Sequence, residues 1–277
     1  MTDKHEENIQ RAGIVPNDKS MPYPRICAHR GFNTVAPENT MPAFGAAVAM
    51  GAEEIEFDIW ATKDGELVTA HDPKLERVSN GSGCIAHHDL AELKELDFGS
   101  HFSEKLKGLQ IPTFEEILRQ FAGRVIMNIH VKIWDELNDP ESDIDPRYEQ
   151  IAELIKKYDC ERHIYFMTIH TESLCKMREL LPNASYCQGS RPGRQVGNDL
   201  MVERAIENGF DKVQFVIWRP IKKEMIDLAH SHGIICNVCQ ANDTESARNF
   251  IEMGIDTVMT DDFHLVRESI KEFLPKK

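Results

Sequence analysis

The sequence has no long apolar run. Nowhere in its 277 residues do apolar side chains continue for the ~18 positions that suggest a membrane-spanning helix. The opening stretch, MTDKHEENIQRAGIVPNDKS, is polar and lacks the basic start, apolar core and small-residue cleavage site of a secretory signal. We therefore expect a cytoplasmic protein without stable membrane insertion.

Positive charge is also scarce. The chain carries 32 Lys and Arg against 46 Asp and Glu, which gives a net charge of -14. This balance argues against a general binder of nucleic acid or of anionic membranes, and it leaves room for a local basic pocket. With 41% hydrophobic residues, the chain is expected to bury a substantial core.

The cysteines do not indicate a disulfide framework. They number seven, which is odd, and they are scattered through apolar segments, so we expect reduced thiols. Cys236 and Cys239 occur together in CNVC. Because positions i and i+3 of a strand face opposite sides, this pair is expected to make a poor metal clamp.

What the sequence does contain is a regular alternation of strand-like and helix-like stretches. Expected strands begin near residues 25, 54, 125, 163, 184, 211, 234 and 256, and each precedes a helix-like segment. Eight such units predict an α/β fold of the TIM (β/α)8 barrel type. A doubly wound sheet is the alternative, but no Gly-rich phosphate loop follows the first strand.

One segment interrupts this alternation. Residues of about 73–112 are rich in Gly, Ser and His, and they are expected to form a small insertion after the second strand. We expect residues 1–22 to be a polar N-terminal extension and residues 23–277 to form a single domain.

Two carboxylates share one face of the strand expected near residue 54. Glu56 and Asp58 alternate with Ile55, Phe57 and Ile59, which point the other way. The active site of a TIM barrel lies at the C-terminal ends of its strands. Two carboxylates that point together into that mouth repel each other unless a cation or a shared proton relieves the charge. Their hard oxygen atoms predict one divalent metal ion, namely Mg, Ca or Mn.

Imidazoles and basic side chains follow other strand ends. His29 and His71 are candidates for a general acid and a general base, since histidine titrates near neutral pH. Arg30 and Lys132 offer a planar fork and a point charge that suit a phosphate. A metal, an acid, a base and two cations together predict a phosphoryl-transfer site.

These residues fall in a series of motifs that closely resembles the glycerophosphodiester phosphodiesterase family. The resemblance extends over nearly the whole chain beyond about residue 22 and is strongest over 26–83. The motifs, in the family's order and spacing, are HRG (29–31), ENT (38–40), E-x-D (56–58), T-x-D-G (62–65), HD (71–72), IPTFEEIL (111–118) and TD (260–261).

The resemblance implies a phosphatidylinositol-phosphodiesterase-like TIM barrel with a role in lipid and glycerol metabolism. The implied reaction is the metal-dependent hydrolysis of glycerophosphocholine or glycerophosphoethanolamine to glycerol 3-phosphate and an alcohol. In the family, the glycerol 2-hydroxyl is thought to attack phosphorus, and water then opens the cyclic phosphate. The matching motifs make His29 and His71 the acid–base pair, Glu56 and Asp58 metal ligands, and Arg30 and Lys132 phosphate contacts.

Two stretches depart from the family pattern. Where the third strand usually reads N-I-E-I-K, with the glutamate as a third metal ligand, this chain reads N-I-H-V-K over 128–132. We expect His130 to take that place and to shift the metal preference toward Mn, Zn, Co or Ni. Residues 239–242, CQAN, replace a W-T-x-N pattern, so the wall around the glycerol or head group is altered. Trp60, Trp134 and Trp218 are candidates to line it instead.

Three functions stay open at this point. The first is an active phosphodiesterase in which His130 ligates the metal. The second is a hydrolase or lyase for another phosphodiester, such as a lysophospholipid, although no membrane-binding apolar surface is visible in the sequence and soluble diesters are favoured. The third is a catalytically weakened binding protein. In each case the partner is a small phosphodiester and not nucleic acid, and a homo-oligomer remains open.

Overall fold

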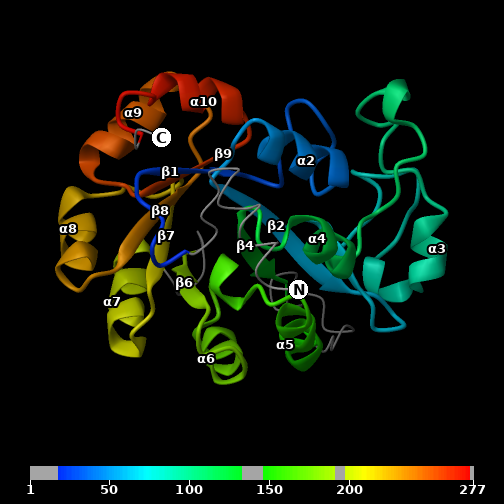
Figure 1. The fold of residues 1–277 in the computed structure, drawn as a ribbon, viewed down its shortest axis with the longest axis horizontal. Helices are drawn as coiled ribbons and strands as arrows, with labels where there is room; N and C mark the ends of the chain where they lie inside the picture. Colours follow the sequence, from blue (N-terminus) through cyan, green and yellow to red (C-terminus); the bar gives the residue numbers. More distant parts are fainter. Residues whose placement is uncertain (1–17, 133–145, 191–196, 275–277) are drawn as a thin grey trace.

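A closed ring of parallel strands forms the centre of the protein. The computed structural model describes residues 18–132, 146–190 and 197–274. Eight strands follow one another around the ring in the order β1, β2, β4, β5, β6, β7, β8 and β9, and β1 pairs with both β2 and β9 to close it. The helices lie outside the ring (Figure 1). The predicted TIM barrel is confirmed.

The strands correspond closely to the predicted ones. They are β1 (Arg25–Ala28), β2 (Glu54–Ala61), β3 (Leu67–Thr69), β4 (Ile126–Val131), β5 (Ile164–Thr168), β6 (Ser185–Gly189), β7 (Lys212–Val216), β8 (Ile235–Cys239) and β9 (Thr257–Thr260). The short β3 runs antiparallel to the end of β2, after the tight turn at Gly65.

Alternation along β2 separates the core from the barrel interior. Ile55, Phe57 and Ile59 are buried in the layer between the strands and the helices. Glu56 and Asp58 point inward, where the register of β2 with β4 sets Glu56 beside Asn128 and Asp58 beside His130. Strand pairing therefore fixes the neighbours of both carboxylates.

The helices of the ring follow the strands as predicted. They are α2 (Met41–Ala49), α4 (Phe114–Phe121), α5 (Tyr148–Lys157), α6 (Thr171–Leu180), α7 (Asn198–Asn208), α8 (Lys223–Ser231), α9 (Thr244–Met253) and α10 (Phe263–Ser269). Thr40 precedes α2 as expected, but its hydroxyl donates to the Pro37 carbonyl (2.5 Å) instead of capping the helix. Among the helices of the described ranges, none has both the length and the apolarity needed to cross a bilayer.

The segment between β3 and α4 forms a small subdomain beside the barrel, at the end of β2 and β3 (Figure 1). It contains α3 (Leu90–Lys94) and two short 3-10 turns, Ile85–His87 and Glu104–Leu106. Its own apolar cluster, which includes Leu75, Leu93 and Ile111, packs against Trp60 and Val68 of the barrel. This packing fixes the subdomain next to the C-terminal ends of the strands.

A buried set of charges fills the opposite, N-terminal end of the barrel. Arg25 Nη1 lies 2.6 Å from Asp18 Oδ1 and 3.0 Å from Glu54 Oε1, and Lys212 Nζ lies 2.9 Å from Asp18 Oδ1. The Tyr165 hydroxyl donates to Glu54 (2.8 Å). All five side chains are almost completely buried. Residues 18–22 thus carry a carboxylate that the barrel interior requires for charge balance.

Candidate active site

A cavity of about 1190 Å³ opens at the C-terminal ends of the strands. The structure brings all of the predicted site residues to its wall. They are His29, Arg30, Glu56, Asp58, His71, His130 and Lys132. They come from β2 and β4, from the residues directly after β1 and β4, and from the loop after β3. The pairing of β1 and β4 with β2 brings them together.

A tight turn after β1 positions the first two of these residues. Gly31 adopts φ +83, and a Cβ there would lie 2.7 Å from the Ala43 carbonyl carbon, so only glycine fits. Arg30 is also left-handed, with φ 56. In this conformation the Arg30 backbone N–H donates to Glu56 Oε2 (3.0 Å). The HRG motif therefore ties the end of β1 to the carboxylate on β2.

Glu56, Asp58 and His130 are the candidate metal ligands. One ligand atom from each lies within 4.8 Å of the others. Burial raises the pKa of Glu56, and the neighbouring charge of Asp58 raises it further. Two buried carboxylates and an imidazole that face one cavity are a suitable donor set for a divalent cation, which would relieve this repulsion.

Several nitrogen groups surround the Asp58 carboxylate. Lys132 Nζ lies 3.0 Å and His130 Nδ1 lies 3.2 Å from Asp58 Oδ1, and the Asn39 side-chain amide donates to Oδ2 (3.1 Å). Burial alone would raise the pKa of Asp58, but the charge of Lys132 and the hydrogen bond with His130 hold it well below its ordinary value. The lowered pKa favours the ionised form of Asp58, which is the form that a metal ligand needs.

His29 is oriented by a carboxylate that we did not predict from the sequence as a site residue. Its Nδ1 lies 2.7 Å from Asp261 Oδ1, just beyond β9, and its Nε2 lies 4.0 Å from Glu56 Oε2. Asp261 also accepts hydrogen bonds from three side-chain amides, those of Asn33, Gln240 and Asn242 (2.6 Å each). Burial would raise the pKa of Asp261, but the His29 hydrogen bond and charge hold it below its ordinary value.

His71 belongs to a second chain of charged groups. Its Nδ1 lies 2.6 Å from Asp72, which accepts from Arg77 Nε (2.5 Å). Arg77 reaches Glu38 (2.7 and 2.8 Å), and Glu38 in turn pairs with Arg30 (2.9 Å). Burial lowers the pKa of His71, which favours its neutral form. Glu38 lies in the ENT motif, but nothing in the sequence indicated that Arg77 would reach the site from the insertion.

The residues predicted to line the wall around the glycerol or head group do not all lie at the cavity in the same way. Trp60 lines the cavity but is buried, with its Nε1 directed at the His71 carbonyl (3.4 Å). Trp218 lines the mouth and is 70% exposed. Trp134 lies outside the described residues. Cys239, Gln240 and Asn242 all line the cavity, so the altered stretch does border the site as expected.

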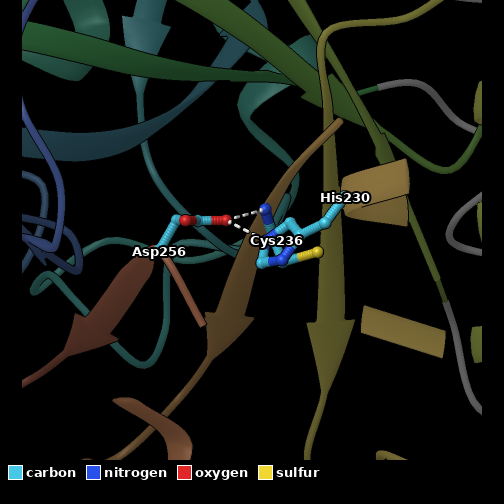
Figure 2. A group of neighbouring side chains, drawn as sticks. All are labelled: His230, Cys236 and Asp256. Atoms are coloured by element: carbon cyan, nitrogen blue, oxygen red, sulfur yellow. Dashed lines mark hydrogen bonds and ion pairs between the residues drawn. The ribbon is translucent and has the colours of Figure 1, made fainter. Parts of the chain in front are cut away.

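The cysteines are all free, as predicted. Cys236 packs in the core outside the strands and Cys239 faces the cavity, which confirms that the two point to opposite sides. Cys236 instead lies near His230 and Asp256 at the other end of the barrel (Figure 2). There the His230 ring and the Cys236 backbone N–H both bind Asp256 Oδ2 (2.8 and 2.7 Å), and burial raises the pKa of the thiol above its ordinary value. These contacts join α8 to β8 and β9 and favour a structural role.

Known proteins share this sequence pattern. The sequence profile of the Glycerophosphoryl diester phosphodiesterase family matches residues 29–265. A glycerophosphodiester phosphodiesterase of Bacillus subtilis (strain 168) is 30% identical over 257 residues, which span 87% of this chain and 85% of that protein. Another, from Caldanaerobacter subterraneus subsp. tengcongensis, is 29% identical over 243 residues, or 86% of this chain and 93% of that one.

Solved structures share the fold. An Oleispira antarctica phosphodiesterase, solved in complex with the product sn-glycerol-3-phosphate, superposes with a TM-score of 0.78 at 23% identity over 90% of this chain and 97% of its own. A glycerophosphodiester phosphodiesterase from Thermotoga maritima gives a TM-score of 0.71 at 23% identity over 91% of this chain and 99% of its own. Their likeness to this chain shows the same barrel fold.

Proposed function

The chain belongs to the glycerophosphoryl diester phosphodiesterase family and is a glycerophosphodiester phosphodiesterase, and we propose that it uses His29 and His71 with one divalent metal. The proposed substrates are glycerophosphodiesters such as glycerophosphocholine or glycerophosphoethanolamine, which are hydrolysed to glycerol 3-phosphate and an alcohol. The observation that carries this proposal is the convergence of two histidines, two buried carboxylates and two cations on one cavity. The product bound in the Oleispira antarctica structure is consistent with it.

Glu56, Asp58 and His130 would hold the metal ion. A bound divalent cation would polarise a phosphoryl oxygen and offset the negative charge that develops on the phosphoryl oxygens. Arg30 would contact the phosphate from the same side, since Glu38 and Asp58 flank its guanidinium (2.9 and 3.9 Å) and keep it in place. Lys132 would supply a second positive charge.

The two histidines would divide the proton transfers between them. The lowered pKa of His71 keeps its imidazole neutral near pH 7, which suits the group that removes a proton from the attacking hydroxyl. His29, paired with the ionised Asp261, would donate a proton to the leaving alcohol oxygen. In the first step the glycerol 2-hydroxyl attacks phosphorus and loses its proton to His71, the P–O bond to the alcohol breaks, and the departing oxygen gains the proton from His29. In the second step His29 takes a proton from water and the water oxygen forms a P–O bond. The P–O bond to the glycerol 2-oxygen then breaks and that oxygen regains a proton from His71, which yields glycerol 3-phosphate.

The proposal is tested by assaying the purified protein with glycerophosphocholine in the presence of Mg, Ca, Mn, Zn, Co or Ni. Phosphorus NMR would identify glycerol 3-phosphate, a cyclic phosphate or another product. Release of glycerol 3-phosphate with at least one metal supports the proposal. The absence of turnover with every metal would instead favour the catalytically weakened binding protein.

The identity of the metal is tested at His130. Imidazole binds Mn, Zn, Co and Ni better than it binds Ca or Mg, so we expect the protein as purified to retain a transition metal. His130→Glu should lower the ratio of Mn affinity to Ca affinity by at least about tenfold, or about 1.4 kcal/mol. Titration calorimetry and mass-spectrometric metal analysis would measure this. An unchanged ratio would show that His130 is not a ligand.

Asp261 is expected to act by positioning His29. Asp261→Asn should lower kcat by about 10- to 100-fold with little change in KM, because the amide weakens the hold on the His29 ring that transfers the proton. Asp262→Asn is a matched control, since it removes the same charge one residue along and an asparagine still caps α10 as Asp262 does. Equal losses in both variants would mean that only local charge matters.

A further inference from the structure

Three potential metal ligands meet at the N-terminal end of the barrel, away from the active site (Figure 2). They are His230 in the last turn of α8, Cys236 near the start of β8 and Asp256 directly before β9. One ligand atom from each lies within 4.8 Å of the others. The pairing of β8 with β9 and the packing of α8 on β8 bring the three together.

The three donors suit zinc better than magnesium or calcium. Cys236 offers a sulfur, His230 a ring nitrogen and Asp256 a carboxylate oxygen. Zinc accepts all three kinds of ligand, and thiolate and imidazole favour it over the harder cations. The candidate ligands in the active site are two carboxylates and one imidazole, with no sulfur. The two groups would therefore differ in the ion that they prefer.

Negative charge surrounds the Cys236 thiol. Burial raises the pKa of this thiol, and the charges of Asp256 and Asp227 raise it further. Asp227 lies one turn before His230 on the same face of α8. A divalent cation would offset both carboxylates, and a thiol that coordinates such an ion gives up its proton. The charges that disfavour a free thiolate thus favour a bound cation.

Solvent can reach this group of side chains. The His230 side chain is 37% exposed and that of Asp256 is 19% exposed, whereas Cys236 is buried. With zinc–ligand distances of about 2.0–2.3 Å, the ligand atoms of a tetrahedral site lie roughly 3.5 Å apart. The three atoms therefore need to move by only about an ångström to surround one ion. The partly exposed His230 ring has room for such a movement.

We propose that His230, Cys236 and Asp256 form a second metal site, which binds one zinc ion and joins α8 to the starts of β8 and β9. On binding, the thiol releases its proton to solvent and the ion replaces the hydrogen bond between His230 and Asp256 (2.8 Å). Water would complete the four ligands. Because the active site of a barrel lies at the other end of the strands, this ion would stabilise the fold and take no part in the reaction. The proposal is independent of the phosphodiesterase activity.

Cobalt(II) is the probe for the thiolate ligand, because a thiolate bound to cobalt gives a near-ultraviolet charge-transfer band. The purified full-length protein, dialysed against a chelator, is titrated with cobalt(II). We expect the band to appear in the wild type, to disappear when zinc is added and to be absent from Cys236→Ser. Cys239→Ser is the matched control, since Cys239 faces the active-site cavity, and it should keep the band.

Thermal unfolding is the second measurement, and it tests the histidine. Zinc at about 100-fold above its dissociation constant should raise the Tm of the wild type by about 5 °C more than that of His230→Ala. An ion in the active site would raise both equally, so the difference reports the second site. His232→Ala is the control and should respond as the wild type does. His232 lies two residues further along and donates to the Leu228 carbonyl (3.0 Å).

Two results would overturn the proposal. A band that survives in Cys236→Ser but is lost in Cys239→Ser would place the thiolate ligand in the active-site cavity. No band in the wild type, with equal zinc-induced shifts in the wild type and His230→Ala, would show that the three side chains form a hydrogen-bonded cluster only. If Cys236→Ser does not fold, His230→Ala decides the matter, since this side chain is partly exposed.

Discussion

Replacing His29 with alanine is expected to lower kcat by about 10²–10⁴-fold, the usual contribution of a positioned acid or base. The imidazole faces the cavity with Nδ1 held by Asp261 (2.7 Å) and Nε2 directed toward Glu56 (4.0 Å). Metal affinity should stay nearly unchanged, because the candidate ligand atoms belong to Glu56, Asp58 and His130. Steady-state kinetics and metal titration of the same preparation would measure both quantities.

His264→Ala provides the control, since His264 is an exposed histidine on α10. It should change neither kcat nor metal affinity. A large drop in metal affinity for His29→Ala would show that His29 is a ligand and not the acid. The double variant with His71→Ala should lose little more than the worse single variant, because groups that act in one reaction are strongly non-additive.

The barrel and the main site residues were predictable because each signal is local. Alternation along a strand decides which side chains point inward, and Glu56 and Asp58 satisfy it within three residues. His29 and Lys132 directly follow their strands, where a barrel builds its active site. When the neighbouring residues already show that a side chain lies at the end of a strand, no tertiary information is needed to place it at the mouth of the barrel.

The partners of these residues were not predictable, because they depend on distant segments. Asp261 lies 232 positions from His29 and reaches it only when β9 closes the ring against β1. Arg77 comes from an irregular segment whose path depends on its own packing, so its contacts with Asp72 and Glu38 have no periodic signature. Trp218 was a candidate for the wall of the site and does line the cavity, but Ile217 beside it was not predicted, because its exposure depends on the loops around it.

The polar character of residues 1–22 also concealed a buried group. Asp18 is 3% exposed, although its sequence neighbours are polar and predicted an extension. Its burial depends on Arg25 at the start of β1 and Lys212 at the start of β7. Composition describes the average character of a stretch of residues. It cannot reveal that one carboxylate in the stretch is buried because two remote cations pair with it.

Asp18→Ala is expected to destabilise the protein by about 3–5 kcal/mol, the usual result of removing one partner from a buried ion pair. The change would leave Lys212 buried at the N-terminal end of the barrel without its 2.9 Å carboxylate partner, and Arg25 would keep the Glu54 carboxylate but lose that of Asp18. This is a large part of the about 5–15 kcal/mol that stabilises a typical protein. The midpoint of urea unfolding, followed by circular dichroism at pH 7, would measure the loss.

Lys19→Ala is the neighbouring control for this prediction. Lys19 is 55% exposed and lies 3.6 Å from Asp211, so its loss should cost no more than about 1 kcal/mol. If both variants unfold at the same urea concentration as the wild type, the buried charges contribute little to stability.

Acidification separates the charge of Asp18 from its packing. Burial would raise the pKa of Asp18, but Lys212 and Arg25 hold it below its ordinary 3.8, so its ionisation contributes stability that is fully present above that value. The contribution is lost as the pH falls through the lower, folded-state pKa, and the gap between wild type and Asp18→Ala should then narrow. A gap that stays constant from pH 7 to below pH 3.8 would attribute the loss to packing alone. Narrowing would show that the first described residues of the chain stabilise the barrel through charge, at the end opposite to its active site.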